Sequence, residues 1–134
     1  MNPKIFSVEE ANALLPQLNS ILIRLQDKKK QIELKQVEID LMEIVNTSGA
    51  PSGTSISKIA NKSLDELNTM VQEYTQLFEE VETWGPVIKD VTQGLVDFYH
   101  VRDQQLIFLC WKQGEPRISF WHDLENGFPG RQKL

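Results

Sequence analysis

The chain has 134 residues, of which 40% are hydrophobic and 25% are charged, and its net charge is -5. These fractions are ordinary for a soluble protein, and the length suits a single domain spanning residues 1–134 with its own core. The negative charge gives no global support to nucleic-acid binding, and the lysines at residues 28–30 have no interleaved aromatic residue, so we expect no nucleic-acid partner. The single cysteine excludes an intrachain disulfide and no apolar run is long enough to span a membrane, so we expect a cytoplasmic protein.

The first predicted element is a long helix over residues 7–45. Ser7 and Glu10 have the spacing of a capping box, in which each side chain accepts a hydrogen bond from the other residue's backbone amide. Pro16 lies about two turns inside the helix, where a proline removes one backbone hydrogen bond, so we expect a kink or a local break. A narrow apolar stripe runs through the first half: Ala11, Leu14, Leu15, Leu18, Ile21, Leu22 and Leu25.

The second half of this helix is apolar on two faces. Leu34, Val37, Leu41 and Ile44 recur at spacings of three, four and three, nearly opposite the main stripe. One face can pack against the other helix of a hairpin, and the second face needs another partner, most simply a second copy of the chain. The alternative is that the second series is partly exposed, since isolated surface aliphatic residues are common.

Residues 46–55 hold turn-forming residues and no large apolar side chain, which predicts a flexible loop. Residues 56–84 keep their apolar positions on one coherent helical face, and Gly85 followed by Pro86 is a typical helix end. The two predicted helices therefore form a long antiparallel hairpin.

From residue 86 the pattern changes to that of strands, and residues 86–122 predict an antiparallel meander of three or four strands followed by a tail over residues 123–134. Residues 106–111 are apolar on both faces, which is typical of a central strand that is covered on both sides, by helix ends and by either the tail or a second subunit. The expected fold is α+β, a long helical hairpin capped by a small meander. We expect a homodimer, formed through the first helix, the meander, or both.

A cluster of polar residues is predicted near the ends of these strands, and it consists of Asp97, Glu115, His122, Asp123 and Arg131. A histidine with carboxylates can bind a divalent metal, with His122, Asp97 and Glu115 as ligands, or perform acid–base chemistry. The alternative is that each residue locks the fold through a salt bridge or a backbone hydrogen bond. Cys110 is interpreted as a small buried hydrophobic residue. The expected structural anchors are aromatic: Trp84, Trp111, Trp121 and Phe128.

Several short motifs lie at the two ends of the chain: Glu9-Glu10-Ala11-Asn12 with Leu14-Leu15-Pro16, then Gly94-Leu95-Val96-Asp97-Phe98, Leu109-Cys110-Trp111, Gly114-Glu115, Trp121-His122, and Gly127-Phe128 with Gly130-Arg131. In these motifs the chain resembles a widespread uncharacterised prokaryotic domain family. Because that family is a domain of unknown function, the resemblance supplies no reaction and no ligand. It implies that six residues belong to a shared pattern: Asp97, Cys110, Trp111, Glu115, His122 and Arg131.

Two functions follow as hypotheses. The first is a non-enzymatic interaction or scaffold module without a cofactor, which acts as a homo-oligomer or binds a protein partner, because the helices are long and no recognised catalytic motif is present. The second is a small metal-dependent or acid–base enzyme, in which Asp97 and His122 converge with one of Glu115, Asp123 or Glu125. The enzyme hypothesis requires His122 and two carboxylates to meet in a cleft.

Overall fold

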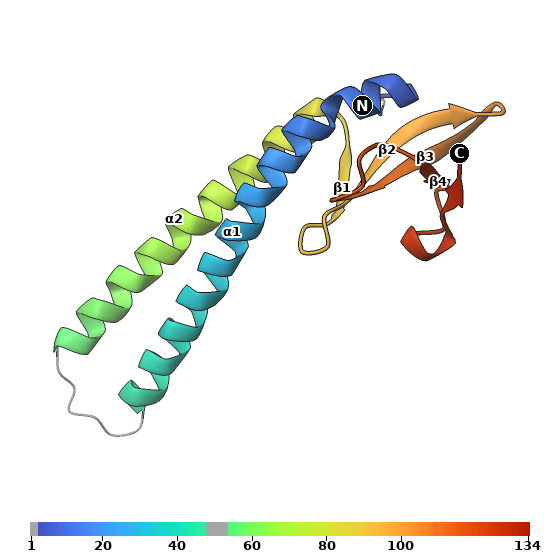
Figure 1. Ribbon diagram of the computed structural model, residues 1–134. Coiled ribbons are helices and arrows are strands. Elements are labelled where there is room, and N and C mark those ends of the chain that lie inside the picture. Colours follow the sequence, from blue (N-terminus) through green and yellow to red (C-terminus); the bar gives the residue numbers. More distant parts are fainter. Residues whose placement is uncertain (1–2, 48–53) are drawn as a thin grey trace. The chain divides into compact units, whose positions relative to one another are not determined.

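The structure is a computed structural model that describes residues 3–47 and 54–134 (Figure 1). Two helices come first, α1 (Val8–Thr47) and α2 (Thr54–Trp84). They are followed by β1 (Val87–Asp90), β2 (Leu95–Arg102), β3 (Gln105–Lys112), β4 (Phe120–His122), the short 3₁₀ helix η1 (Phe128–Gly130) and β5 (Gln132–Lys133). This order confirms the predicted α+β class. The predicted loop over residues 46–55 lies mostly outside the described residues, and α1 and α2 extend to Thr47 and Thr54 on either side of it.

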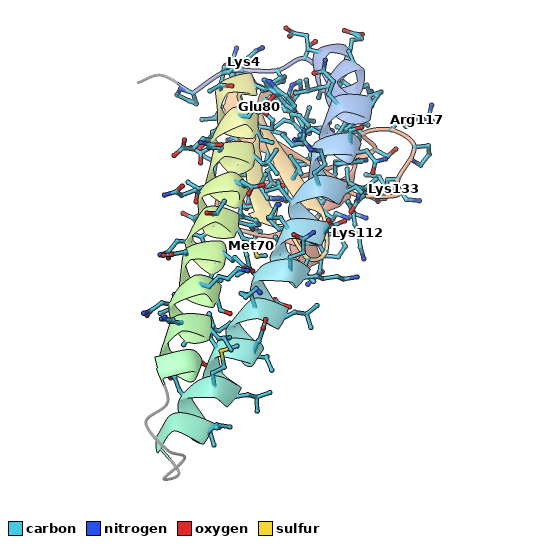
Figure 2. The ribbon with its side chains drawn as sticks, turned by 90° about the vertical axis from the view of Figure 1, so that its left-hand side faces the viewer. Lys4, Met70, Glu80, Lys112, Arg117 and Lys133 are labelled. Carbon is cyan, nitrogen blue, oxygen red and sulfur yellow. The ribbon has the colours of Figure 1, made fainter. Side chains whose placement is uncertain are left out.

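The packing divides the chain into two compact units. One unit comprises the chain up to Arg24 together with Phe78–Leu134, and the other comprises Leu25–Leu77. The first contains the whole sheet with the adjoining ends of both helices. The second is a stretch of helical hairpin, in which α1 and α2 run side by side (Figures 1 and 2).

The start of α1 confirms the capping box. The Ser7 amide donates to Glu10 Oε1 at 2.9 Å, and the Glu10 amide donates to Ser7 Oγ at 3.1 Å. The break that was one of two expectations for Pro16 does not occur, because α1 is assigned as one continuous helix through that residue. At the end of α2, Gly85 has φ of +107°, a left-handed conformation that glycine adopts without strain.

The sheet has five strands in the order β1-β2-β3-β4-β5, and all its neighbours are antiparallel. The meander was expected to have three or four strands. The fifth, β5, comes from the predicted tail, in which Gln132 pairs with Trp121 and Lys133 pairs with Phe120. The strand pairing places Asp97 opposite Cys110 and Cys110 opposite Phe120, so these three residues lie in one row across β2, β3 and β4.

The core of the first unit lies between α1 and one face of the sheet. Phe6 packs edge-on against Phe98, with ring centroids 5.1 Å apart, and its amide donates to the Tyr99 carbonyl at 2.7 Å. The Asn12 side chain of α1 accepts a hydrogen bond from the Ile118 amide at 2.7 Å. Most of the predicted stripe and central strand is buried, but Leu14 is only partly buried and Leu106 is exposed. The buried residues of this core include Ala11, Leu15, Leu18, Ile21, Leu22, Val96, Phe98, Ile107, Phe108, Leu109 and Trp111. Both faces of β3 are therefore covered within one chain.

The second unit is held by a buried seam and by ion pairs between its helices. Leu25 and Ile39 are buried, and Met70 lies on the side of α2 that faces α1 (Figure 2). Lys28 pairs with Glu73 at 2.9 Å, and Lys35 pairs with Glu66 at 2.9 Å. Neither described helix is apolar over a stretch long enough to cross a membrane.

Candidate metal centre

Three neighbouring strands place Asp97, Cys110 and His122 on one face of the sheet. Asp97 pairs with Cys110 across β2 and β3, and His122 lies two residues along β4 from the partner of Cys110. Alternate residues of a strand point to the same face, so the pairing brings the three side chains together. One ligand atom from each, a carboxylate oxygen, the thiol sulfur and an imidazole nitrogen, lies within 4.8 Å of the others, and all three residues are buried.

Both ring nitrogens of His122 have partners. Nδ1 lies 2.7 Å from the Asp123 carbonyl oxygen, and Nε2 lies 3.1 Å from Asp97 Oδ2. A carbonyl can only accept a hydrogen bond, so Nδ1 carries the proton. The lone pair of a neutral His122 is then at Nε2, which faces Asp97. A backbone carbonyl that fixes the tautomer in this way is a typical second-shell feature of metal-binding histidines.

The electrostatics around Asp97 favour a bound proton or a cation. Burial raises the pKa of this carboxyl, and the opposing effects of His122 and Lys89 offset the shift only in part. The Lys89 ammonium lies 4.0 Å from Asp97 Oδ2 and is half exposed. A carboxylate with this little solvent needs a positive partner, which a bound cation can supply.

Cys110 is held as a thiol. Burial and the Asp97 carboxylate raise the pKa of its sulfur to about 11, although the positive charge of Arg131 acts in the opposite direction. A thiol with this pKa is a poor nucleophile at neutral pH. Metal binding removes that obstacle, because a coordinated cysteine is deprotonated by the cation itself.

Glu115 does not join the triad, although it was one of the expected metal ligands. Its carboxylate accepts two hydrogen bonds from the Arg131 guanidinium, at 3.0 and 2.6 Å, and a third from the Lys112 amide at 2.8 Å. Burial raises the pKa of Glu115, but these hydrogen bonds outweigh it and the net shift is downward. Arg131 also lies between the rings of Phe120 and Phe128, at 3.9 and 4.3 Å from their centroids. Glu115 and Arg131 therefore form a clamp that fastens the tail to the sheet.

The other predicted residues divide between the two roles. The Asp123 side chain is exposed and accepts from the Asn126 amide at 2.9 Å, so only its backbone carbonyl belongs to the triad. Trp111 is a buried anchor whose Nε1 donates to the Glu115 carbonyl at 2.9 Å. Trp121 and Phe128 are half buried and lie against the guanidinium groups of Arg102 and Arg131, and Trp84 is also half buried.

A small cavity adjoins the triad. It has a volume of about 200 Å³, and the triad residues contribute to its wall. The rest of the wall comes from strand residues and from the segment that follows β4: Lys89, Leu95, Leu124, Glu125, Asn126, Gly127 and Phe128. The cavity can admit a water molecule or a small ligand beside the three side chains.

Residues 4–134 match the model of a protein family that is described as an uncharacterized conserved protein (DUF2203). The chain belongs to the DUF2203 family. This match confirms the resemblance to an uncharacterised family that the short motifs indicated. The description of the family assigns no activity and no ligand. No curated protein and no solved structure matches the DUF2203 chain significantly.

The sequence predicted that Asp97 and His122 belong to a cluster of polar residues, but Cys110 was interpreted as a small buried hydrophobic residue. The lone cysteine has no ligand-like spacing to His122 or Asp97, and only the strand pairing brings it beside them. The sequence held one indirect indication that Cys110 is more than a core residue, which is that the family resemblance includes it in a shared pattern with Asp97 and His122. Glu125 lines the cavity, and it is therefore the one further carboxylate of the enzyme hypothesis that lies near the triad.

Proposed function

We propose that this DUF2203 protein binds a divalent transition metal, of which zinc is the best example, through Asp97, Cys110 and His122. The observation that supports the proposal is the buried meeting of a carboxylate, a thiol and an imidazole whose tautomer is fixed by a backbone carbonyl. Each is a common zinc ligand. A carboxylate, a thiolate and a neutral imidazole carry two negative charges, which a divalent cation would balance within the ligand set. The reducing cytoplasm expected from the sequence would keep Cys110 available as a ligand.

The geometry requires only small adjustments. Tetrahedral zinc with ordinary bond lengths separates its oxygen, nitrogen and sulfur ligands by roughly 3.4–3.6 Å. Asp97 Oδ2 and His122 Nε2 are 3.1 Å apart, and the complete set lies within 4.8 Å. Small side-chain rotations would close the difference, because the backbone of three paired strands already holds the three residues together.

Three protein ligands beside a cavity are typical of a site that keeps one coordination position open. A metal bound there would supply a Lewis acid to a small ligand in the cavity. Glu125, on the cavity wall, could position or deprotonate that ligand. The enzyme hypothesis required His122 to meet two carboxylates, and His122 meets only Asp97, because Glu115 pairs with Arg131. The proposal is therefore a metal site in which Cys110 takes the place of the second carboxylate.

The experiment is a metal titration of the purified chain, with competition against a chromophoric chelator. We expect one zinc ion per chain, and a loss of affinity of about a hundredfold or more in Cys110→Ser, Asp97→Asn and His122→Gln. Asp123→Asn is the matched control, because its exposed side chain does not face the triad and its backbone carbonyl remains. Equal zinc affinity in the wild type and the three ligand variants would refute the site.

A second candidate function is an assembly role for the helical hairpin, as expected from the sequence. It is favoured by the exposure of the apolar series Leu34, Val37, Leu41 and Ile44 on α1. Burial of these residues by a second copy, or by another protein, would stabilise a complex. Light scattering of wild-type chain and of Leu41→Ser tests this role in its homodimeric form, which predicts a dimer that the substitution weakens.

A further inference from the structure

The three residues of the candidate metal centre are almost closed to solvent. Asp97 and His122 are each 2% exposed, and Cys110 is 1% exposed. A hydrated cation is larger than a water molecule, so it cannot meet all three ligand atoms through the adjoining cavity as that cavity stands. A metal site nevertheless needs an entry path. Part of the cavity wall therefore has to move when a metal enters or leaves.

The cavity wall has one side that belongs to the sheet and one that does not. On the sheet side, β2 and β3 are paired without interruption from Leu95 with Lys112 to Arg102 with Gln105. The other side is the segment that joins β4 to β5, residues 123–131, which we call the cover. Its wall residues are Leu124, Glu125, Asn126, Gly127 and Phe128. Displacing the cover leaves the strand ladder intact, so the cover is the part of the wall that can open.

The backbone hydrogen bonds of the cover tie it to itself. The Asn126 amide donates to the Asp123 carboxylate at 2.9 Å, and the Gly130 amide donates to the Gly127 carbonyl at 2.9 Å. Leu124 is 45% exposed although it lines the cavity. These bonds can persist when the cover moves as a unit, and little apolar burial at Leu124 opposes that movement.

The clamp fastens the end of the cover. The Arg131 guanidinium donates to Glu115 at 3.0 and 2.6 Å and lies 3.9 Å from the centroid of the Phe120 ring and 4.3 Å from that of Phe128. Phe120 pairs with Cys110 across β4 and β3, and Phe128 lines the cavity. The clamp therefore closes the cover directly beside a metal ligand, while Glu115 itself ligates nothing in the triad.

We propose that the cover is the gate of the candidate metal centre and that the clamp between Glu115 and Arg131 holds this gate closed, so that the clamp sets the rate of metal exchange. The inference rests on the proposed metal site and adds its regulation. A weaker clamp opens the cover more often, which speeds entry and release alike. Their ratio, the dissociation constant, stays nearly the same as long as the cover is mostly closed.

The test compares wild type with Glu115→Gln, which weakens the clamp and keeps Arg131 in place. Zinc-loaded chain is mixed in a stopped-flow instrument with a chromophoric chelator, at concentrations where the release rate no longer depends on the chelator. Loss of one of two charged hydrogen bonds should speed zinc release about tenfold. The association rate should rise by a similar factor, and the dissociation constant should change less than about threefold.

Phe6→Leu is the matched control for a general loss of stability. Phe6 is buried and packs on Phe98, which follows Asp97 in β2 and therefore points to the opposite face of the sheet. The substitution destabilises the same unit without touching the cover. Zinc release should stay within about twofold of the wild-type rate, because release needs only local opening.

Hydrogen exchange of the metal-free chain gives a readout that does not depend on zinc. Amides of residues 124–131 should exchange about tenfold faster in Glu115→Gln, whereas amides of β2 should not change. Unchanged exchange of the cover, unchanged zinc release in Glu115→Gln, or equal acceleration in Phe6→Leu would overturn the gate and leave the metal site standing. A wild-type chain that binds no zinc would overturn the metal site and the gate together.

Discussion

Glu115→Gln tests whether the clamp between the tail and the sheet stabilises the first unit. The substitution keeps the size of the side chain but removes its charge, and it replaces one of the two oxygens that face Arg131 with an amide donor. The hydrogen bond from Arg131 Nη2 at 2.6 Å is lost, and the bond from Nη1 at 3.0 Å keeps its charged donor but has a neutral acceptor. The side chains of Arg131 and Glu115 are only 15% and 22% exposed, so solvent replaces little of what is lost.

The expected magnitude follows from these contacts. One lost and one weakened charged hydrogen bond at a mostly buried position should lower the free energy of unfolding by about 2 kcal/mol. At a urea dependence of about 2 kcal/mol per molar, the unfolding midpoint should fall by about 1 M. Glu79→Gln, on an exposed part of α2, is the control and should leave the midpoint unchanged. A double-mutant cycle with Arg131→Met isolates the pair.

The result that would refute this reasoning is a change below about 0.5 kcal/mol, which is the scale of an exposed ion pair. An equal loss in the Arg131→Met background would also refute it, because the effect would then come from the Lys112 amide or from the unfolded state rather than from the clamp.

Three further predictions concern the same unit. The pKa of Glu115 is lower in the folded state, so the stabilisation by the clamp is fully present above the unfolded pKa of about 4.3 and is lost as the pH falls through the folded pKa. The difference in stability between wild type and Glu115→Gln should therefore be constant from about pH 7 to pH 5 and should disappear in more acidic buffer. Gly94→Ala should destabilise the protein by about 2–3 kcal/mol in urea unfolding, because φ is +68° and the new Cβ would clash with Gln113 Cβ at 2.4 Å. Gly114→Ala, where φ is +102° and the new Cβ meets open space, should cost only the backbone strain of about 1–2 kcal/mol. Equal losses in the two variants would show that the clash contributes nothing. Phe6→Ala removes a buried ring that packs on Phe98 and should destabilise by about 3–4 kcal/mol by the same assay, whereas a loss below about 1 kcal/mol would show that this packing contributes little.

The parts of the fold that could be predicted from the sequence depend on local rules. Ser7 and Glu10 are three residues apart, so their capping box needs no knowledge of the rest of the chain, and its hydrogen bonds confirm it. Gly85 ends α2 for an equally local reason. Residues 106–111 predicted a strand that is covered on both sides, because side chains of a strand point to alternate faces and here both faces are apolar.

The parts that could not be predicted depend on strand pairing and on the path of the tail. Cys110 meets Asp97 only because β2 and β3 pair in one register, and a shift by one residue would turn Cys110 to the other face. The strand β5 has two residues, too few for a periodic pattern. The turn between β2 and β3 uses positive φ at Asp103 and Gln104, where glycine or asparagine would be the usual signals. Arg131 reaches Glu115 because the tail turns back at η1. Glu115, which the sequence predicted as a metal ligand, therefore pairs with Arg131 instead.

The measurement that tests the metal centre most directly is the absorption spectrum of the chain titrated with Co²⁺, a substitute for zinc whose spectrum reports its ligands. The account predicts saturation at one ion per chain, with a thiolate-to-cobalt charge-transfer band that disappears in Cys110→Ser and a ligand-field spectrum that changes in His122→Gln and Asp97→Asn. Asp123→Asn should retain the wild-type spectrum. A wild-type chain that binds no Co²⁺ stoichiometrically, or that shows the same spectrum in all of these variants, would contradict the assignment of Asp97, Cys110 and His122 as a metal site.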